Sequence, residues 1–339
     1  MKLTDFDYEL PPGLIAQHPI EPRDSSRLLV LDRSDGSIRH RSFREIPEYI
    51  NPGDMLVFNN SRVIAARLKG TIGGSEKHAE ILLLRQIDGR TWETLVRPGR
   101  RLPPGAQVML SNGQGLETTA TVTGRHADGT RIIEFSNPAA LEKIGEMPLP
   151  PYIKARLEDR GRYQTVYAEV TGSAAAPTAG LHFTPALLDK IKARGANLTF
   201  LTLHIGLDTF QPVRAADPAH HHIHSEYGCI NAETARLLNQ TRFTGKRIIA
   251  VGTTSMRLIE AASSGGQVKP CDGQVGLFIL PGYRFKSVDA LITNFHLPKS
   301  TLLMMVSAFA GRELMLNCYR QAIHEGYRFY SFGDAMLIL

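Results

Sequence analysis

The stretch from Arg67 to Glu134 differs in texture from the rest of the chain, and this difference constrains the fold most. Short runs of alternating apolar and polar residues follow one another there, separated by glycine-rich or polar turns. The pattern is typical of an all-β unit, either a small barrel or a sandwich. We therefore expect strands within residues 79–86, 91–96, 107–110, 118–123 and 130–135.

Strand and helix candidates alternate in the remainder of the chain, as in a layered α/β domain. Two strands are expected before the β-rich unit, over residues 27–32 and 54–58, and a proline-rich hinge at residues 147–151 follows it. Because the β-rich unit separates pieces of one α/β sheet, we interpret it as an insertion. The sequence predicts a discontinuous α/β domain over residues 1–66 and 151–339, with a β-barrel domain over residues 67–150.

Composition excludes several classes of protein. The chain has 339 residues, of which 42% are hydrophobic, enough for a large core and for two domains. No apolar run reaches about 18 residues, and the first residues lack the regions of a signal peptide, so we expect a cytoplasmic protein without a membrane segment. Cys229, Cys271 and Cys318 are scattered. Their spacing argues against a disulfide framework, a zinc ribbon and an iron–sulfur cluster.

Polar residues follow four of the expected α/β strands. They occupy residues 59–62, 204–206, 252–257 and 294–301. Open α/β sheets bind ligands at the carboxyl ends of their strands. If the four strands are parallel, these clusters and the loop that carries Thr178 and His182 share one cleft.

The loop with Thr178 and His182 precedes a predicted helix. Thr184 is a good N-cap, and apolar residues recur at helical spacing over residues 186–194 before Gly195. The positive end of the helix dipole disfavours imidazolium, which would keep His182 neutral and able to accept a proton. His182 is therefore a candidate general base. The alternative is that Thr178 and His182 only tie down a loop.

A second cluster suits an anion. Gly252, Thr253 and Thr254 offer backbone N–H groups and hydroxyls at a strand-to-helix junction, and Arg257 lies one turn further on. A glycine turn with ordinary threonine caps explains these residues equally well. The chain contains neither a GxGxxG pattern after a strand nor a P-loop, which disfavours dinucleotide and P-loop sites.

The segment 220–226 brings imidazoles close to a carboxylate. Its members His221, His224 and Glu226 are compatible with a metal site, with a hydrogen-bonding site for a polar ligand, or with a surface cluster. A metal site needs a further ligand from elsewhere, such as His204 or His296. We favour the two readings without a metal.

Two pairs near the N-terminus have a structural and a functional interpretation. Asp24 and Arg27 precede an apolar strand, where such a pair serves as a clamp more often than as a ligand contact. Asn60 and Arg62 either cap a strand end or contact hydroxyls, base edges or carboxylates.

Basic residues form two groups in turn-rich segments of a chain with a net charge of +6. Each group is compatible with a solvated face or with phosphate contacts. The groups comprise Arg97, Arg100 and Arg101, and Lys154, Arg156, Arg160 and Arg162.

Together these residues resemble one family, the S-adenosylmethionine:tRNA ribosyltransferase-isomerases of queuosine biosynthesis. The resemblance covers almost the whole chain and departs from the family pattern at Ala65 and Asp208, where the family has proline and glycine. The matching segments are LIAQ at 14–17, RDSSRLL at 23–29, VFNNSRV at 57–63, YQTVYA at 163–168, AAPTAGLHFT at 175–184, VGTTSMR at 251–257, TNFHLPKSTLLM at 293–304 and YRFYSFGDAM at 327–336.

The resemblance implies a three-layer α/β/α domain with an inserted β-barrel. It also implies transfer of the ribosyl moiety of S-adenosylmethionine to 7-aminomethyl-7-deazaguanine at the tRNA wobble position. The ribose is rearranged to give epoxyqueuosine, and adenine and methionine leave. S-adenosylmethionine is then a consumed cosubstrate, so no cofactor and no metal are expected. The partner is the anticodon stem-loop, and we expect a monomer.

The chemistry requires a base that removes a proton next to the sulfonium and an acid that protonates adenine. We assign the base to His182, oriented by Thr178, and the acid to His204 or His296. The expected cosubstrate and base contacts are Asp24, Arg27, Asn60, Arg62, Gly180, His224, Glu226, Gly252, Thr253, Thr254, Arg257 and Asn294. The expected tRNA contacts are Arg97, Arg100, Arg101, Lys154, Arg156 and Arg162. Without the resemblance, a metal-dependent hydrolase and a non-catalytic tRNA-binding protein are the alternatives.

Overall fold

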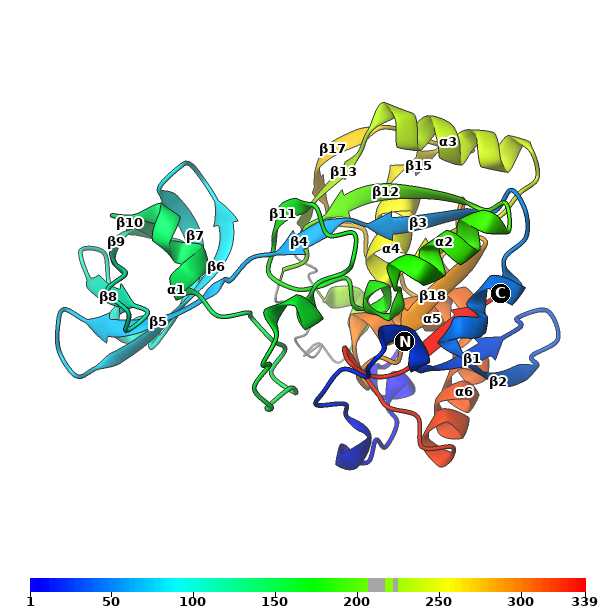
Figure 1. Cartoon of the computed structure of the whole chain (residues 1–339), viewed down its shortest axis with the longest axis horizontal. Helices are drawn as coiled ribbons and strands as arrows, with labels where there is room; N and C mark the ends of the chain where they lie inside the picture. The colour runs from blue at the N-terminus through cyan, green and yellow to red at the C-terminus, as the bar shows by residue number, and fades with distance from the viewer. Residues whose placement is uncertain (207–216, 222–224) are drawn as a thin grey trace. The chain divides into compact units, whose positions relative to one another are not determined.

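The computed structural model describes residues 1–206, 217–221 and 225–339, coloured in Figure 1 by residue number. These residues divide into two compact units. The first contains Met1–Ser61, Pro151–Val170 and Ala176–Leu339, and the second contains Arg62–Pro150 and Thr171–Ala175. The predicted fold class is confirmed, because a mixed α/β unit is interrupted by a closed β-barrel.

The α/β unit is built on a nine-stranded mixed sheet in the described part of the chain (Figure 1). Its central strands run parallel, so their carboxyl ends lie at one edge. In sheet order these are β12 (Asn197–Leu203), β3 (Met55–Asn59), β14 (Ile248–Val251) and β18 (Ala290–Asn294). The strands β17 (Cys271–Val275) and β13 (Glu226–Ile230) extend the β12 side, and β19 (Ala335–Ile338), β1 (Arg27–Leu31) and β2 (Ile38–Ser42) extend the β18 side.

Both faces of this sheet are covered, because strands buried on two sides carry continuous apolar runs. In β3, Met55 and Val57 pack into one core while Leu56 and Phe58 pack into the other. The first core is closed by α3 (Ala232–Phe243), α4 (Thr253–Ala262), α5 (Thr301–Ala310) and α6 (Arg312–His324). The second is closed by α2 (Pro185–Ala193) and the 3-10 segment Phe43–Tyr49. The unit therefore has three layers.

The second unit is a closed barrel, and most of its strands alternate buried residues with more exposed ones. In barrel order they are β10 (Arg131–Phe135), β7 (Thr91–Arg97), β6 (His78–Gln86), β5 (Arg67–Ile72), β8 (Gln107–Ser111) and β9 (Glu117–Arg125). Its core includes Leu68, Ile81, Leu83, Val108 and Phe135, and the short helix α1 (Leu141–Ile144) packs on it. Two small strand pairs complete the described strands: β4 (Ser61–Val63) with β11 (Val170–Ser173), and the antiparallel pair of β15 (Ser263–Ser264) with β16 (Gln267–Val268).

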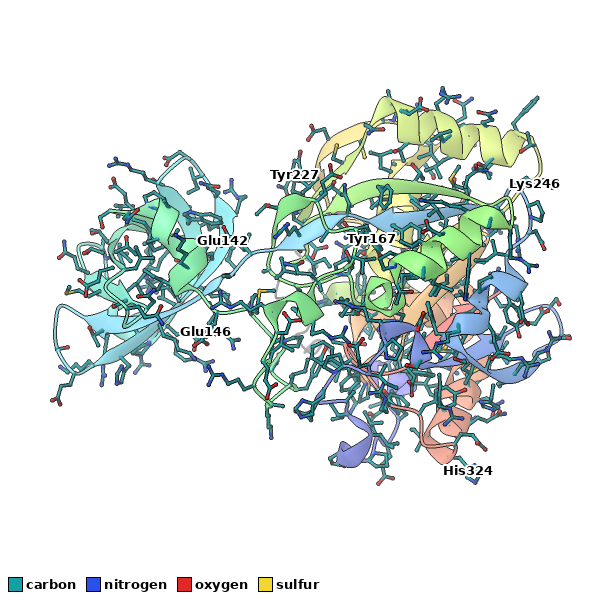
Figure 2. All side chains as sticks on the ribbon, in the orientation of Figure 1. Glu142, Glu146, Tyr167, Tyr227, Lys246 and His324 are labelled. Carbon is teal, nitrogen blue, oxygen red and sulfur yellow. The ribbon has the colours of Figure 1, made fainter. Side chains whose placement is uncertain are left out.

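Local signals in the sequence explain where several elements begin and end. Helix α2 begins after Thr184, whose hydroxyl accepts a hydrogen bond from Leu187 N at 3.2 Å, and its chain turns at Gly195 with φ of +84°. Ser300 caps α5 in the same way through Leu303 N at 3.1 Å. Tyr167, labelled in Figure 2, packs edge-on against Phe58 of β3.

Candidate functional site

A pocket lies at the carboxyl ends of the parallel strands, as the sequence predicts for polar residues that follow such strands. Six predicted site residues from three separate segments line it: Thr178, Gly252, Thr253, Thr254, Asn294 and His296.

Backbone geometry at Gly252 shapes one wall of this pocket. Gly252 has φ of +90°, a conformation that side chains rarely adopt, and its N–H donates to Ile292 O at 2.8 Å. Helix α4 begins at the next residue, so its first N–H groups have no acceptor within the helix. The Thr254 hydroxyl accepts a hydrogen bond from Asn59 Nδ2 at 3.3 Å.

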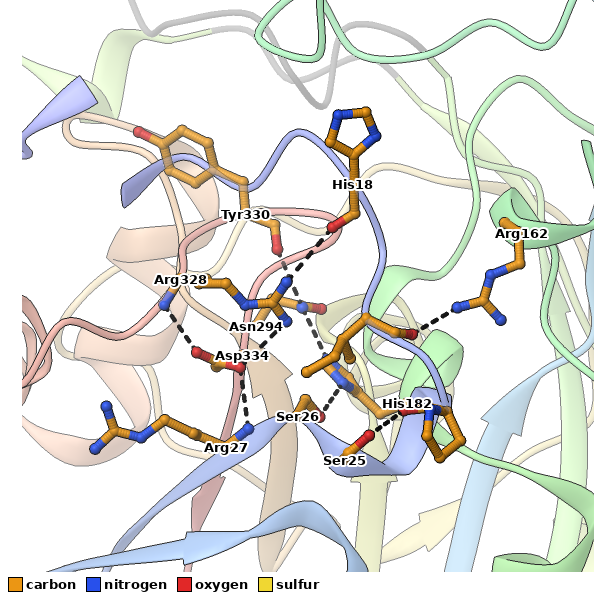
Figure 3. Close-up of polar contacts among 12 residues, drawn as sticks. His18, Ser25, Ser26, Arg27, Arg162, His182, Asn294, Arg328, Tyr330 and Asp334 are labelled. Carbon is orange, nitrogen blue, oxygen red and sulfur yellow. Dashed lines mark hydrogen bonds and ion pairs between the residues drawn. The ribbon is translucent and has the colours of Figure 1, made fainter. Parts of the chain in front are cut away.

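His182 is enclosed between two side chains beside the pocket and does not line it (Figure 3). Its Nδ1 lies 2.8 Å from Ser26 Oγ, and its Nε2 lies 3.0 Å from Asn294 Nδ2. Burial, followed by the charges of Arg328 and Arg23, lowers the pKa of His182 to about 3. The ring is therefore neutral as predicted, but desolvation rather than the helix dipole is the main cause. The expectation that Thr178 orients the ring is not met, because its hydrogen-bond partners are Ser26 and Asn294.

His296 belongs to the loop after β18 and lines the pocket. Its Nε2 lies 2.9 Å from Thr293 Oγ1. Tyr319 OH accepts a hydrogen bond from His296 N at 2.9 Å, and Tyr8 OH donates to His296 O. Burial lowers the pKa of His296 to about 3, so this imidazole is also neutral near pH 7.

His204, which follows β12, is half-buried and lies next to the pocket-lining residue Ile205. Its Nδ1 is 2.9 Å from Ser61 Oγ, and its ring stacks on Tyr227 with 5.6 Å between centroids. Burial lowers the pKa of this imidazole. His204 itself does not line the pocket.

The structure gives Arg257 a partner within the protein. Its guanidinium forms a buried ion pair with Glu226, and Glu226 Oε1 accepts a hydrogen bond from Gly206 N at 2.9 Å. Burial lowers the pKa of Arg257 to about 10. Neither residue lines the pocket. Arg257 is thus neutralised by Glu226, contrary to the expectation that it faces a ligand carboxylate. His224 and Asp208 lie outside the described residues.

Five further predicted contacts lie away from the pocket lining. Both polar atoms of the Asn60 amide are hydrogen-bonded within the protein: Nδ2 donates to Glu169, and Oδ1 accepts from the Thr202 hydroxyl. Asp24 pairs with Arg44 and accepts from Thr184, while Arg27 lies over the Tyr327 ring. A Cβ at Gly180 would overlap Tyr167 OH, so this glycine permits close packing. Arg62 is exposed on β4.

The predicted tRNA contacts differ in whether their side chains are exposed or are paired within the protein. Arg97, Arg100 and Arg101 are exposed on the barrel, at a turn held by buried Arg131, which donates to Gly99 O and Leu102 O at 2.8 Å. Lys154 and Arg156 are exposed in the α/β unit. Arg162 differs from them, because its guanidinium donates to Ile20 O at 2.7 Å and pairs with Glu21 at 3.0 Å.

Comparison with known proteins gives consistent matches over the chain. A family model described as "Queuosine biosynthesis protein" matches residues 3–338. Proteins named S-adenosylmethionine:tRNA ribosyltransferase-isomerase from Moorella thermoacetica and Symbiobacterium thermophilum are each 54% identical, and one from Desulfitobacterium hafniense is 50% identical, with all of both chains covered in each case. The chain belongs to the S-adenosylmethionine:tRNA ribosyltransferase-isomerase family.

Its membership in this transferase family agrees with a solved structure. The crystal structure of an S-adenosylmethionine tRNA ribosyltransferase from Thermotoga maritima matches with a TM-score of 0.58 and 41% identity, covering 99% of this chain and 100% of the other.

Several pocket residues of this family member were not singled out from the sequence. Tyr152, Ser300, Tyr330 and Ser331 line the pocket, and Ser26 contacts Nδ1 of His182. Four of these five lie within segments that resemble the family, which is the signal that could have found them; Tyr152 does not.

Two further observations concern only the residues that the structure describes. Across residues 1–206, 217–221 and 225–339, no group of three or more histidine, cysteine or acidic side chains is arranged to hold a metal ion. None of the helices in those residues has the length and apolar character needed to cross a bilayer.

Proposed function

We propose that this chain transfers and isomerises the ribosyl moiety of S-adenosylmethionine onto 7-aminomethyl-7-deazaguanine at the tRNA wobble position. The product is epoxyqueuosine in tRNA, with release of adenine and methionine. S-adenosylmethionine is consumed as a cosubstrate. The observation that carries the proposal is the pocket at the strand ends, in which a helix start, hydroxyls, aromatic rings and an imidazole meet in a chain of this family.

The start of α4 suits the methionine carboxylate. Gly252, Thr253 and Thr254 line the pocket, and unpaired N–H groups at a helix N-terminus attract anions. Arg257 contributes indirectly in this proposal, because its charge is balanced by Glu226.

Proton transfer is best supported at His296. This imidazole lines the pocket, and Thr293 engages only its Nε2. We assign to His296 Nδ1 the removal of the proton next to the sulfonium, whose positive charge acidifies the neighbouring carbon. His182 is less suitable as a base because Ser26 and Asn294 occupy both of its nitrogens. His204 remains our candidate for the acid that protonates adenine.

Contacts to the anticodon stem-loop are assigned to exposed cations. Arg97, Arg100 and Arg101 on the barrel and Lys154 and Arg156 on the α/β unit are free to meet phosphates. Arg162 instead fixes the segment around Ile20 and Glu21.

The test is to incubate the full chain with S-adenosylmethionine labelled in its ribose and tRNA that carries the precursor base. The proposal requires the label to enter tRNA while adenine and methionine are released in equal amounts. Release of S-adenosylhomocysteine would indicate a methyltransferase and contradict it. Activity that is lost with chelators would favour the metal-dependent hydrolase, and binding without any turnover would favour a non-catalytic tRNA-binding protein.

A further inference from the structure

Asn294 has an amide whose orientation is determined by its neighbours. This residue ends β18, lines the pocket and is only 3% exposed. Its Nδ2 lies 3.2 Å from Tyr330 O and 3.0 Å from His182 Nε2. A main-chain carbonyl can only accept a hydrogen bond, so the atom that faces it must be the amide nitrogen. Both Nδ2 hydrogens are therefore used, one on Tyr330 and one on His182.

This orientation also determines the tautomer of His182. Because Nε2 accepts from Asn294, the ring proton of the neutral imidazole is on Nδ1 and is donated to Ser26 Oγ. Ser26, His182 and Asn294 form one chain of hydrogen bonds, drawn in Figure 3. Turning the amide of Asn294 would set its oxygen against the Tyr330 carbonyl, so the side chain is locked.

The locked amide leaves one acceptor unused. Asn294 Oδ1 is buried and has no hydrogen-bond partner among the residues that the structure describes. A buried carbonyl oxygen without a donor is costly, and a pocket-lining residue can recover that cost from a ligand. The oxygen requires an N–H or O–H group and repels a carboxylate.

Three aromatic residues line the same pocket and suit a nucleobase. They are Tyr152, Phe295 and Tyr330, and the rings of Tyr152 and Tyr330 lie 4.8 Å apart between centroids. Adenine presents an exocyclic amine, which can donate to an asparagine carboxamide oxygen. Because both Nδ2 hydrogens of Asn294 are already used, the contact available here is a single hydrogen bond to Oδ1. We propose that Asn294 Oδ1 accepts a hydrogen bond from the exocyclic amine of the adenine in S-adenosylmethionine, with Ser26 and His182 as positioning residues. The assignment rests on the proposed function.

The test compares two ligands that differ at this amine. Calorimetry measures binding of S-adenosylmethionine and of its inosine counterpart, in which a carbonyl replaces the amine. The full chain is used with an unmodified tRNA transcript, which lacks the acceptor base and leaves the ligand unconsumed. We expect the inosine counterpart to bind the natural chain about 10- to 100-fold more weakly, because it leaves the buried Oδ1 acceptor unpaired. Equal affinities would overturn the inference.

Variants localise the discrimination to Asn294. Asn294→Leu removes the acceptor at similar size and should bring the ratio of affinities close to one. Asn239→Leu is the matched control, because Asn239 pairs with Val268 on both sides of its amide and lies outside the pocket lining; it should keep the full ratio.

The remaining outcomes separate the two proposals. If S-adenosylmethionine itself fails to bind the natural chain, the proposed function fails, and this inference with it. If S-adenosylmethionine binds but Asn294→Leu still prefers it to the inosine counterpart, only the assignment of Asn294 to the amine fails. The assignment also fails if Asn294→Leu loses its preference for S-adenosylmethionine over an analogue with a deoxyribose, because Asn294 would then contact the ribose. Should Asn294→Leu not fold, equal affinities of the two ligands for the natural chain still overturn the inference.

Discussion

Asn294 donates a hydrogen bond of 3.0 Å to Nε2 of His182, across 112 positions of the sequence. Because this bond occupies Nε2, His182, the base candidate from the sequence, has a structural role beside the pocket. His296, the histidine that lines the pocket, is then the stronger candidate for proton transfer.

The two buried histidines should make the fold sensitive to acid. Their pKa values are about 3 in the folded chain, against 6.5 for free histidine, so the unfolded chain binds more protons below pH 6.5. The contribution of the two neutral imidazoles to the free energy of unfolding is fully present above pH 6.5 and is lost as the pH falls from 6.5 toward 3. At pH 5 each histidine should cost about 2 kcal/mol. Denaturant titrations at pH 7 and pH 5 measure the loss.

The contribution of one histidine can be isolated with His182→Gln. This variant should be less stable at pH 7 but should lose about 2 kcal/mol less than the natural chain on going to pH 5. An identical loss in both chains would contradict the assigned pKa of His182.

Single turnovers should separate the roles of the two histidines. His296→Gln should slow transfer of the labelled ribose from bound cosubstrate by about 100-fold or more, because general acid–base groups contribute at this scale. His182→Gln should chiefly raise KM, since it loosens Asn294 without removing the proton acceptor. The opposite pattern, with a lost rate in His182→Gln and an unchanged rate in His296→Gln, would return the base to His182.

Gly252→Ala should impair both stability and binding of the cosubstrate. Gly252 has φ of +90°, and an L side chain held there costs about 1 to 3 kcal/mol. Relaxation of that strain should move the first N–H groups of α4. The control is Gly13→Ala, since a Cβ at Gly13 meets no atom within 4 Å and φ is not positive. Thermal unfolding and calorimetry check both variants, and a neutral Gly252→Ala would be inconsistent with this account.

Replacing Arg100 and Arg101 by Gln should weaken tRNA binding and reduce its salt dependence. Each lost phosphate contact should lower the slope of log K against log salt by about 0.7 to 0.9. The rate of transfer at saturating tRNA should change little. Arg236→Gln is the control, because Arg236 is exposed on α3 and paired with Glu233. If the slope of log K against log salt is the same in the natural chain, the double variant and Arg236→Gln, the barrel turn does not contact tRNA.

The sequence predicted those parts of the fold that depend on local pattern. Alternation marked five of the six barrel strands but not β5, apolar runs marked the parallel strands, and Thr184 marked the start of α2. The edge at which polar residues gather also followed, because parallel strands share it.

Side-chain pairing could not be predicted in the same way, because it depends on packing between distant segments. Ser26 contacts His182 from 156 positions away, and Glu226 of β13 neutralises Arg257 of α4. Such partners decide whether a residue at a strand end lines the pocket or pairs with other side chains of the protein. Composition and spacing name the residue types but not these contacts.

The hydrogen-bond chain of Ser26, His182 and Asn294 is tested most directly by the protonation state of His182, measured by NMR of nitrogen-15-labelled histidine with His182→Gln for assignment. We expect a neutral ring with its proton on Nδ1 throughout pH 5 to 8, because burial and the hydrogen bond from Asn294 stabilise that form. A proton on Nε2, or a titration of this ring near neutral pH, would contradict it.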